Sequence, residues 1–254
     1  MVLLGENLEV GSYGDGRNYL LPTGWPAIQN SVLSNALAAA HDAVFSENAL
    51  PRLRSYFNPI GDFAGTSFLD AEPNPPGDLV AADLYALGRL SMTIHNYQGR
   101  LVLGEGPSRN RALELLRAIP ADARITDLDP GILQKMWTFY DHLRTLLSTP
   151  ERKSSHWVFA AKLCARKRPN LFPVRDSKVC ELLAGDLRPK LRAHRIGQFH
   201  IDLQFFAHVM TDDKITGHLA YLQRTCSDAG VRTDASLLRL MDVLLWTAAT
   251  QISP

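Results

Sequence analysis

The part of this chain best equipped for chemistry is the segment from Trp157 to Val179, WVFAAKLCARKRPNLFPVRDSKV. It joins an apolar helix to three consecutive cations, Arg166, Lys167 and Arg168, and then to a connection bounded by two prolines. A single carboxylate, Asp176, opens the segment that follows. Because helix N-termini and clustered cations both favour anionic groups, the arrangement is suited to a phosphate-bearing substrate held beside one acid.

Asp176 has a structural and a catalytic interpretation. Aspartate is a favoured N-cap residue, so capping or an ion pair explains it without any chemistry, and this is the commoner use of such an acid. A fixed carboxylate can also stabilise the oxocarbenium-like charge that develops when an N-glycosidic bond breaks. Lys162, in the middle of the preceding helix, is either a buried amine or a side chain whose charged end reaches solvent.

Aromatic and cationic side chains extend this hypothesis to a whole nucleotide site. A base turned out of its stack needs an aromatic or apolar slot, and its flanking phosphates need lysine or arginine. The alternative for the tryptophans is the core, because they recur on periodic apolar faces. The aromatic candidates are Tyr140 and Trp157, with Tyr56, Trp137 and Phe172, and the cationic candidates are Arg166, Lys167, Arg168, Arg175 and Lys178.

Charge is unevenly distributed along the chain. The net charge is +1 at pH 7, but residues 151–200 hold 12 lysine and arginine against 4 acidic residues, which is +8 locally and −7 for the remainder. A basic segment on an otherwise acidic protein indicates an anionic partner, and nucleic acid is the candidate. Helix C-termini also attract cations, which accounts for Arg166 to Arg168 but not for Arg188 to Arg195.

Several classes of protein and site are excluded. No run approaches the roughly 18 to 20 apolar residues of a membrane span, and the N-terminus lacks the basic start and longer apolar stretch of a signal peptide. We therefore expect a cytoplasmic protein with no membrane partner, while the oligomeric state is left open. The three cysteines and eight histidines show no metal-ligand spacing, and no GxSxG or Walker-type loop occurs. No metal and no cofactor are predicted, and Cys164 and Cys180 are expected to be buried thiols.

Hydrophobic periodicity predicts a mainly α fold, with one multi-helix domain over residues 1–254 and at most a small β-hairpin in the N-terminal third. The expected place of that hairpin, or of an irregular excursion, is 55–69, where aromatic and β-branched runs are separated by Asn, Pro and Gly. Residues 1–26 are expected to form an irregular arm, and 1–75 a possible N-terminal subregion. The predicted helices cover residues 26–45, 79–92, 108–119, 130–147, 155–168, 176–184, 189–194, 197–210, 213–229 and 234–250.

Acidic residues at the start of three of these helices are predicted N-caps, because the carboxylate accepts from free backbone N–H groups there. These residues are Asp78, Asp176 and Asp234. Gly185 and Gly230 fit the position that follows a helix.

Three stretches resemble an uncharacterised protein family found mainly in actinobacteria. They are DLVAADLYALGRLS, AAKLCARKRPNLFPVRDSKV and SLLRLMDVLLW, so the resemblance spans about residues 50–250. It implies no activity.

A second, more distant resemblance does imply chemistry. A helix, a basic residue before proline, and a Pro-Val-x-Asp segment opening another helix are similar to the helix-hairpin-helix DNA glycosylase superfamily. There a Pro-Val-Asp segment presents the catalytic aspartate, which assists departure of a damaged base. The resemblance thus implies that Asp176 is catalytic, with Pro173 and Val174 before it. This chain differs in having Arg175 inserted before the acid and no glycine-containing hairpin in STPERKSSHW. The positions where strand-cleaving members carry a lysine fall near His156 and Trp157 here, with Lys153 nearby.

Three functions therefore stand open. The first is a monofunctional, DNA glycosylase-like hydrolase of N-glycosidic bonds that uses Asp176. The second is a non-catalytic nucleic-acid-binding module on the same helical scaffold. The third is a protein-interaction or toxin-associated domain whose basic segment meets an acidic protein. Whether the protein is an enzyme is not decided by the sequence, since one fold hosts many functions.

Overall fold

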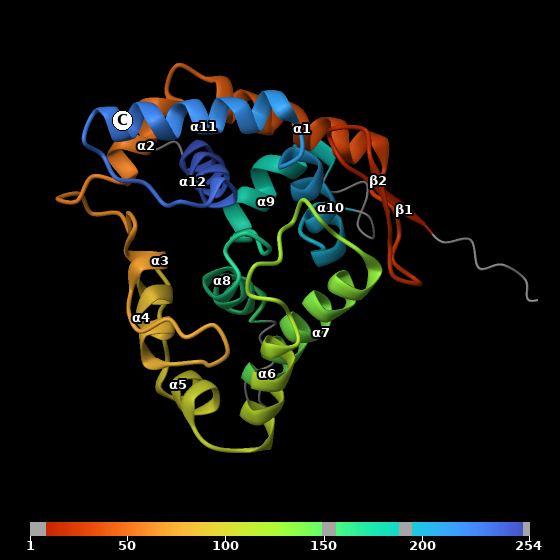
Figure 1. The fold of residues 1–254 in the computed structure, drawn as a ribbon, viewed down its shortest axis with the longest axis vertical. Helices are drawn as coiled ribbons and strands as arrows, with labels where there is room; N and C mark the ends of the chain where they lie inside the picture. Colours follow the sequence, from red (N-terminus) through yellow and green to blue (C-terminus); the bar gives the residue numbers. More distant parts are fainter. Residues whose placement is uncertain (1–8, 149–155, 188–194, 251–254) are drawn as a thin grey trace, which may run out of the picture.

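The computed structural model describes residues 9–148, 156–187 and 195–250. Within these ranges the chain is mainly α-helical, with one antiparallel hairpin near the N-terminus, which confirms the predicted fold class (Figure 1). The elements are β1 (Val10–Ser12), β2 (Asn18–Leu20), α1 (Asn30–Phe45), α2 (Ala49–Tyr56), α3 (Ser67–Asp70), α4 (Ala81–Arg89), α5 (Asn96–Leu103), α6 (Pro107–Arg117), α7 (Pro130–Leu147), α8 (Trp157–Lys167), α9 (Ser177–Ala184), the 3-10 helix η1 (Gly185–Leu187), α10 (Phe199–Val209), α11 (Asp213–Asp228) and α12 (Leu237–Ala249).

The hairpin lies where an irregular arm was expected, and that prediction is wrong. β1 pairs with β2 in the register Gly11 to Tyr19, and Gly16, at φ +87°, allows the tight turn between them. Tyr13 and Tyr19 anchor the strands, with ring centroids 4.6 Å apart and both side chains buried. Of the two alternatives predicted for 55–69, the hairpin is absent and the irregular excursion is present, as a loop between the end of α2 and α3.

Strong apolar periodicity gave the best helix predictions. The helix over 130–147 is confirmed as α7, and Asp176 caps α9 as expected by accepting a hydrogen bond from the Lys178 N–H at 2.9 Å. Asp78 and Asp234 are not N-caps. Val80 precedes α4 and donates to the Asp83 carboxylate, and Ser236 caps α12. The helix predicted at 189–194 lies outside the described residues.

Helix α8 lies in the middle of the molecule. It contacts α4 and α7, while the next helix, α9, contacts α1 and α12. In Figure 1, α1 and α11 run along the top of the molecule and α5 and α6 lie at the bottom, with α8 and α9 between them. Every residue of α8 from Phe159 to Lys167 is buried, cations included.

The buried cations of α8 share one carboxylate. Asp83 of α4, itself fully buried, lies 3.4 Å from Arg166 Nε and 3.1 Å from Lys167 Nζ. Lys167 also donates to the Asn74 side chain at 2.8 Å. Arg166 donates to the carbonyls of Phe68, Leu69 and Ala71 at the end of α3.

Arg168 holds the end of a second helix in the same manner. Its guanidinium donates to the carbonyls of Leu116 and Ile119, at the end of α6, at 2.8 and 2.7 Å, and to Pro76 at 2.8 Å. The unpaired carbonyls of a helix C-terminus carry negative partial charge, so an arginine is a favourable partner. The prediction that Arg166, Lys167 and Arg168 form a phosphate-binding surface is therefore wrong, because all three are buried against internal partners.

Asp83→Asn keeps the size of the side chain but leaves two buried cations without an acid. Breaking a buried ion pair from one side costs about 3–5 kcal/mol, so we expect the free energy of unfolding in urea to fall by about that amount. The matched control is Glu114→Gln, which removes the exposed ion pair with Arg111 at 3.1 Å and should cost less than about 1 kcal/mol. Equal losses in the two variants would contradict the proposed role of Asp83.

Candidate functional site

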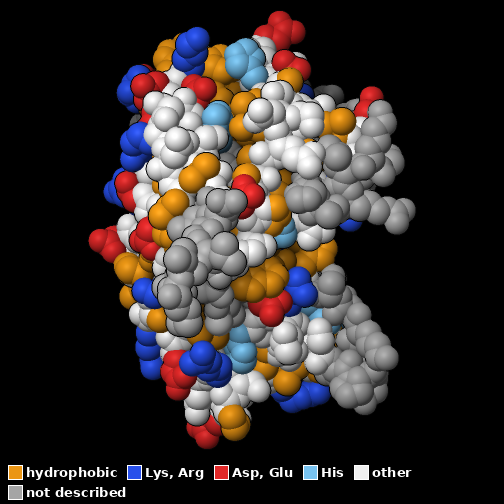
Figure 2. Space-filling model, turned by 90° about the vertical axis from the view of Figure 1, so that its right-hand side faces the viewer, with side chains coloured by type: hydrophobic (Ala, Val, Ile, Leu, Met, Phe, Trp, Pro, Cys, Tyr) orange, Lys and Arg blue, Asp and Glu red, His pale blue; other side chains and the backbone are white. Residues whose placement is uncertain are grey.

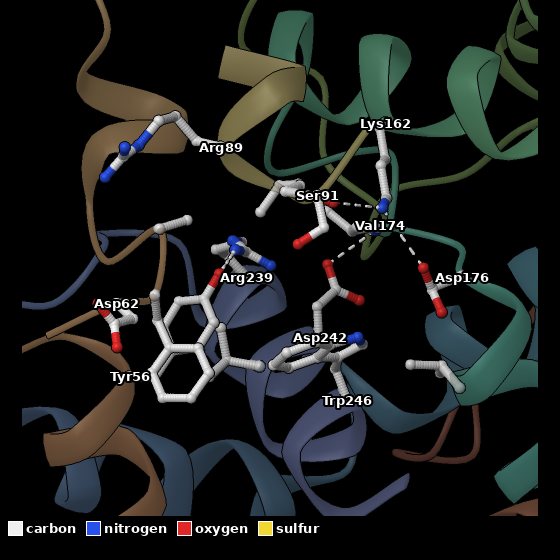
Figure 3. A pocket seen from close by; sticks show the side chains of 15 residues that line it. Tyr56, Asp62, Arg89, Ser91, Lys162, Val174, Asp176, Arg239, Asp242 and Trp246 are labelled. Carbon is white, nitrogen blue, oxygen red and sulfur yellow. Dashed lines mark hydrogen bonds and ion pairs between the residues drawn. The ribbon is translucent and has the colours of Figure 1, made fainter. Parts of the chain in front are cut away.

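A pocket opens between α2, α8, α12 and the start of α9 (Figure 3). It encloses about 520 Å³ of space, including the part open to solvent. Its lining includes Lys162 of α8, Asp176 at the start of α9, and Arg239 and Asp242 of α12, together with the ionisable side chains of Tyr56, Asp62 and Arg89. The predicted catalytic acid therefore lies in the wall of a cavity as well as at a helix end.

Asp176 makes two contacts that fix its carboxylate. One oxygen, Oδ1, accepts the capping hydrogen bond from the Lys178 N–H. The other, Oδ2, lies 3.4 Å from the ammonium of Lys162. Both contacts bring positive charge to the carboxylate, one as a helix N-terminus and one as a full cation. The structural interpretation of Asp176 is thus correct, and it is compatible with a role in the pocket.

Lys162 is a buried amine rather than a side chain that reaches solvent. Its Nζ donates to the Leu90 carbonyl at 3.0 Å, and the side chain is almost fully buried. Burial lowers the pKa of Lys162, while the neighbouring Asp176 opposes that shift. The sequence did not identify Lys162 as part of the site. The residues around Lys162 do not show that the chain turns after α8 and brings Asp176 back to the helix face that carries Lys162.

One wall of the pocket is aromatic. The rings of Tyr56 and Phe63 are stacked with centroids 5.6 Å apart, and Trp246 meets Phe63 edge-on at 6.1 Å. The sequence analysis names Tyr56 as a possible wall residue, but not Trp246. Planar ligands gain large contact areas against such walls.

The other aromatic candidates surround a buried arginine instead. The Arg175 guanidinium lies 5.3 Å from the ring centroid of Tyr140 and 5.2 Å from that of Trp157. It pairs with Asp202 at 2.7 Å and donates to the Tyr140 hydroxyl at 3.0 Å. Arg175, Tyr140 and Trp157 do not line this pocket. They form a separate cation–π cluster in which Arg175 is buried, and their binding of substrate stays a prediction.

Lys178 and Arg89 are exposed cations. Lys178 has 59% of its side chain exposed and lies 3.6 Å from Glu181, and Arg89 lines the mouth of the pocket. On the face shown in Figure 2, the lysine and arginine side chains of the described residues are interspersed with acidic ones along one edge. The basic composition of residues 151–200 is therefore largely internal in the part of the segment that the structure describes.

Helix α12 contributes a second acid that the sequence did not single out. Asp242 is buried, and its Oδ2 accepts a hydrogen bond from the Val174 N–H at 2.8 Å. Burial raises the pKa of Asp242 to about 7, against the opposing effects of Arg239 and of that hydrogen bond. Arg239 itself donates to the Tyr56 hydroxyl at 2.5 Å and lies 3.4 Å from Asp234.

The described ranges contain neither a candidate metal site nor a candidate membrane span. No group of three or more His, Cys, Asp or Glu side chains is placed to hold a metal ion. No helix there has the length and apolar character needed to cross a membrane. Cys164 is buried as predicted, whereas Cys180 is half-buried.

Comparison with known proteins identifies the family. Residues 49–249 match the model of DUF6308, a family of unknown function, and the chain belongs to that family. No curated protein matches the chain, and no solved structure does so. The prediction of an uncharacterised family is thus confirmed.

Asp242→Asn tests the burial of this carboxyl group through the pH dependence of stability. A folded-state pKa near 7 exceeds the unfolded value of about 3.9, so Asp242 stabilises the fold fully below about pH 4 and loses that contribution as pH rises through 7. Relative to Asp242→Asn, the wild type should lose stability on the order of a few kcal/mol between pH 4 and pH 8. Urea unfolding across that range measures the difference.

The other buried acids, including Asp234, are present in both proteins and drop out of the comparison. Parallel stability curves for the two proteins would show that Asp242 titrates normally.

Proposed function

We propose that this protein hydrolyses an N-glycosidic bond, with Asp176 as the catalytic carboxylate, as its resemblance to the helix-hairpin-helix DNA glycosylases implies. The observation that carries the proposal is the position of Asp176, which lines an aromatic pocket and is paired with the buried Lys162 at 3.4 Å. A carboxylate held by two fixed contacts is preorganised for electrostatic stabilisation.

The reaction needs little beyond this carboxylate and a water molecule. As the bond between the sugar carbon and the base nitrogen breaks, positive charge develops on the sugar, and Asp176 stabilises it. The water oxygen then bonds to the sugar carbon, and the water proton ends on the departing base. Lys162 acts as a positioning residue, because its ammonium keeps Asp176 Oδ2 oriented toward the pocket.

The surroundings of Asp176 support a base-bearing substrate. Tyr56, Phe63 and Trp246 offer a wall for a planar base outside its stack. Arg89 lines the pocket, is exposed and donates to the Ser67 hydroxyl at 3.2 Å, and we assign it as the cation for an anionic group such as a phosphate. Nucleic acid is the proposed form of the substrate, with Lys178 as a further exposed cation, rather than the buried cations of α8.

A non-catalytic module is the second candidate. It is favoured by the two contacts of Asp176, since a capping hydrogen bond and an ion pair give this residue a purely structural use. Such a module would bind nucleic acid or an acidic protein on the same helical scaffold without releasing a base.

Base release tests the two candidates directly. The substrates are single-stranded and duplex oligonucleotides with one uracil, hypoxanthine, 8-oxoguanine or ethenoadenine, alongside the matching free nucleosides. Free base is measured by mass spectrometry. We expect the wild type to release at least one of these bases and Asp176→Asn to be slower by about 10²–10³-fold, as for the loss of one preorganised electrostatic group.

The control replaces another capping aspartate in the same way. Asp212 caps α11 through the N–H groups of Lys214 and Ile215 and does not line the pocket, so Asp212→Asn should keep wild-type rates. Undiminished release by a folded Asp176→Asn would show that Asp176 is not the catalytic acid. If the wild type binds these oligonucleotides in a salt-dependent manner but releases no base, the non-catalytic module is the better account.

A further inference from the structure

One carboxylate oxygen of Asp242 is unused. Its Oδ1 has no hydrogen-bond partner among the described residues, although the side chain is only 3% exposed. Its Oδ2 is held by the Val174 N–H, so the carboxyl group is fixed in orientation. A buried polar atom without a partner costs about 1–3 kcal/mol, and a ligand or a water molecule that reaches the atom relieves that cost.

The position of Asp242 shows where that ligand would lie. In Figure 3 it lies near the centre of the pocket, between Arg239 and Tyr56 on one side and Lys162 and Asp176 on the other. Trp246 follows Asp242 by one turn of α12, so both side chains share one face of that helix. The pocket therefore offers a flat aromatic surface and a hydrogen-bonding atom side by side.

We infer that Asp242 is a specificity-determining residue whose Oδ1 binds the polar edge of a planar heteroaromatic ring lying against Trp246. Flat rings with polar edges are recognised by aromatic stacking together with hydrogen bonds to the edge. A purely apolar ligand would leave Oδ1 unpaired. This inference rests on the proposed function for the nature of the ligand. It assigns recognition of the base to Asp242 and the chemistry to Asp176.

The protonation state of Asp242 defines which edge it binds. Because burial raises its pKa to about 7, the group below neutral pH is a carboxylic acid that donates its proton to a ring nitrogen or a carbonyl oxygen. Above that pH it is a carboxylate and can only accept. The charged and titratable groups that share the pocket are Arg239 on the same helix, Tyr56 of α2, Lys162 of α8, Asp176 at the start of α9, and Asp62 and Arg89.

A site of this kind discriminates strongly against rings that lack the edge. When a buried polar group is built to meet a ligand atom, an analogue without that atom leaves the group unpaired and binds far more weakly. Indole is such an analogue, because it is planar and aromatic but has no acceptor on its edge. Hypoxanthine, adenine and uracil all have one.

Binding of these four probes to the full-length protein tests the inference by calorimetry. At pH 6 we expect at least one of the three bases to bind at least tenfold more tightly than indole, with an affinity that falls as pH rises through 7. Asp242→Asn keeps a donor and should bind that base within about threefold of wild type, without the pH dependence. Asp242→Leu should lose about tenfold or more and most of the preference over indole.

Three results would overturn the inference. They are the absence of base binding by the wild type at millimolar concentration, an unchanged preference over indole in Asp242→Leu, or the same pH dependence in wild type and Asp242→Asn. The comparison of pH dependence uses Asp242→Asn, which preserves the hydrogen bond to Val174. It therefore tests the inference even if Asp242→Leu does not fold.

Failure here is distinguishable from failure of the proposed function. Asp242-dependent binding of a base by a protein that releases none would remove the hydrolase proposal and leave this inference intact. Base release by Asp242→Leu with unchanged KM and unchanged base preference would remove this inference and leave the hydrolase proposal intact.

Discussion

The architecture depends on the burial of Asp83 between two cations of α8. Arg166 and Lys167 are inside the protein and cannot lose their charge cheaply, so they require this acid and the carbonyls around it. Through the same side chains α8 holds the end of α3, and through Arg168 the end of α6. Lys162 lies one turn before Arg166 on α8. The contacts of Arg166 and Lys167 that hold α8 in place therefore also hold the Lys162 amine in the pocket.

The pocket is assembled from segments that meet on this fixed helix. The connection after α8 brings the Val174 N–H to Asp242 and, two residues later, Asp176 to Lys162. Asp176 and Asp242 therefore line one cavity in different surroundings. Asp176 lies beside the Lys162 ammonium and at the N-terminus of α9. Asp242 is buried on α12 and accepts a hydrogen bond from the Val174 N–H. Carboxylates with contrasting environments in one site are suited to different tasks.

The sequence predicted what local chemistry decides. Long apolar periodicity gave α7, and the preference of aspartate for helix starts gave the cap of α9. It failed where the partner is distant along the chain. A run of Arg166, Lys167 and Arg168 looks like a surface, because nothing nearby shows that Asp83 is buried against it. For the same reason the sequence did not predict that Lys162 and Asp242 belong to the site, because their roles depend on chain segments that meet only in the pocket.

The most direct test of the central claim is single-turnover release of free base by the wild type and by Asp176→Asn, each shown to be folded by circular dichroism. A base released by the wild type, and about 10²-fold more slowly or not at all by the variant, is the result predicted for a catalytic carboxylate in this pocket. Equal rates in the two proteins, or no release by the wild type from any of the substrates, would contradict it.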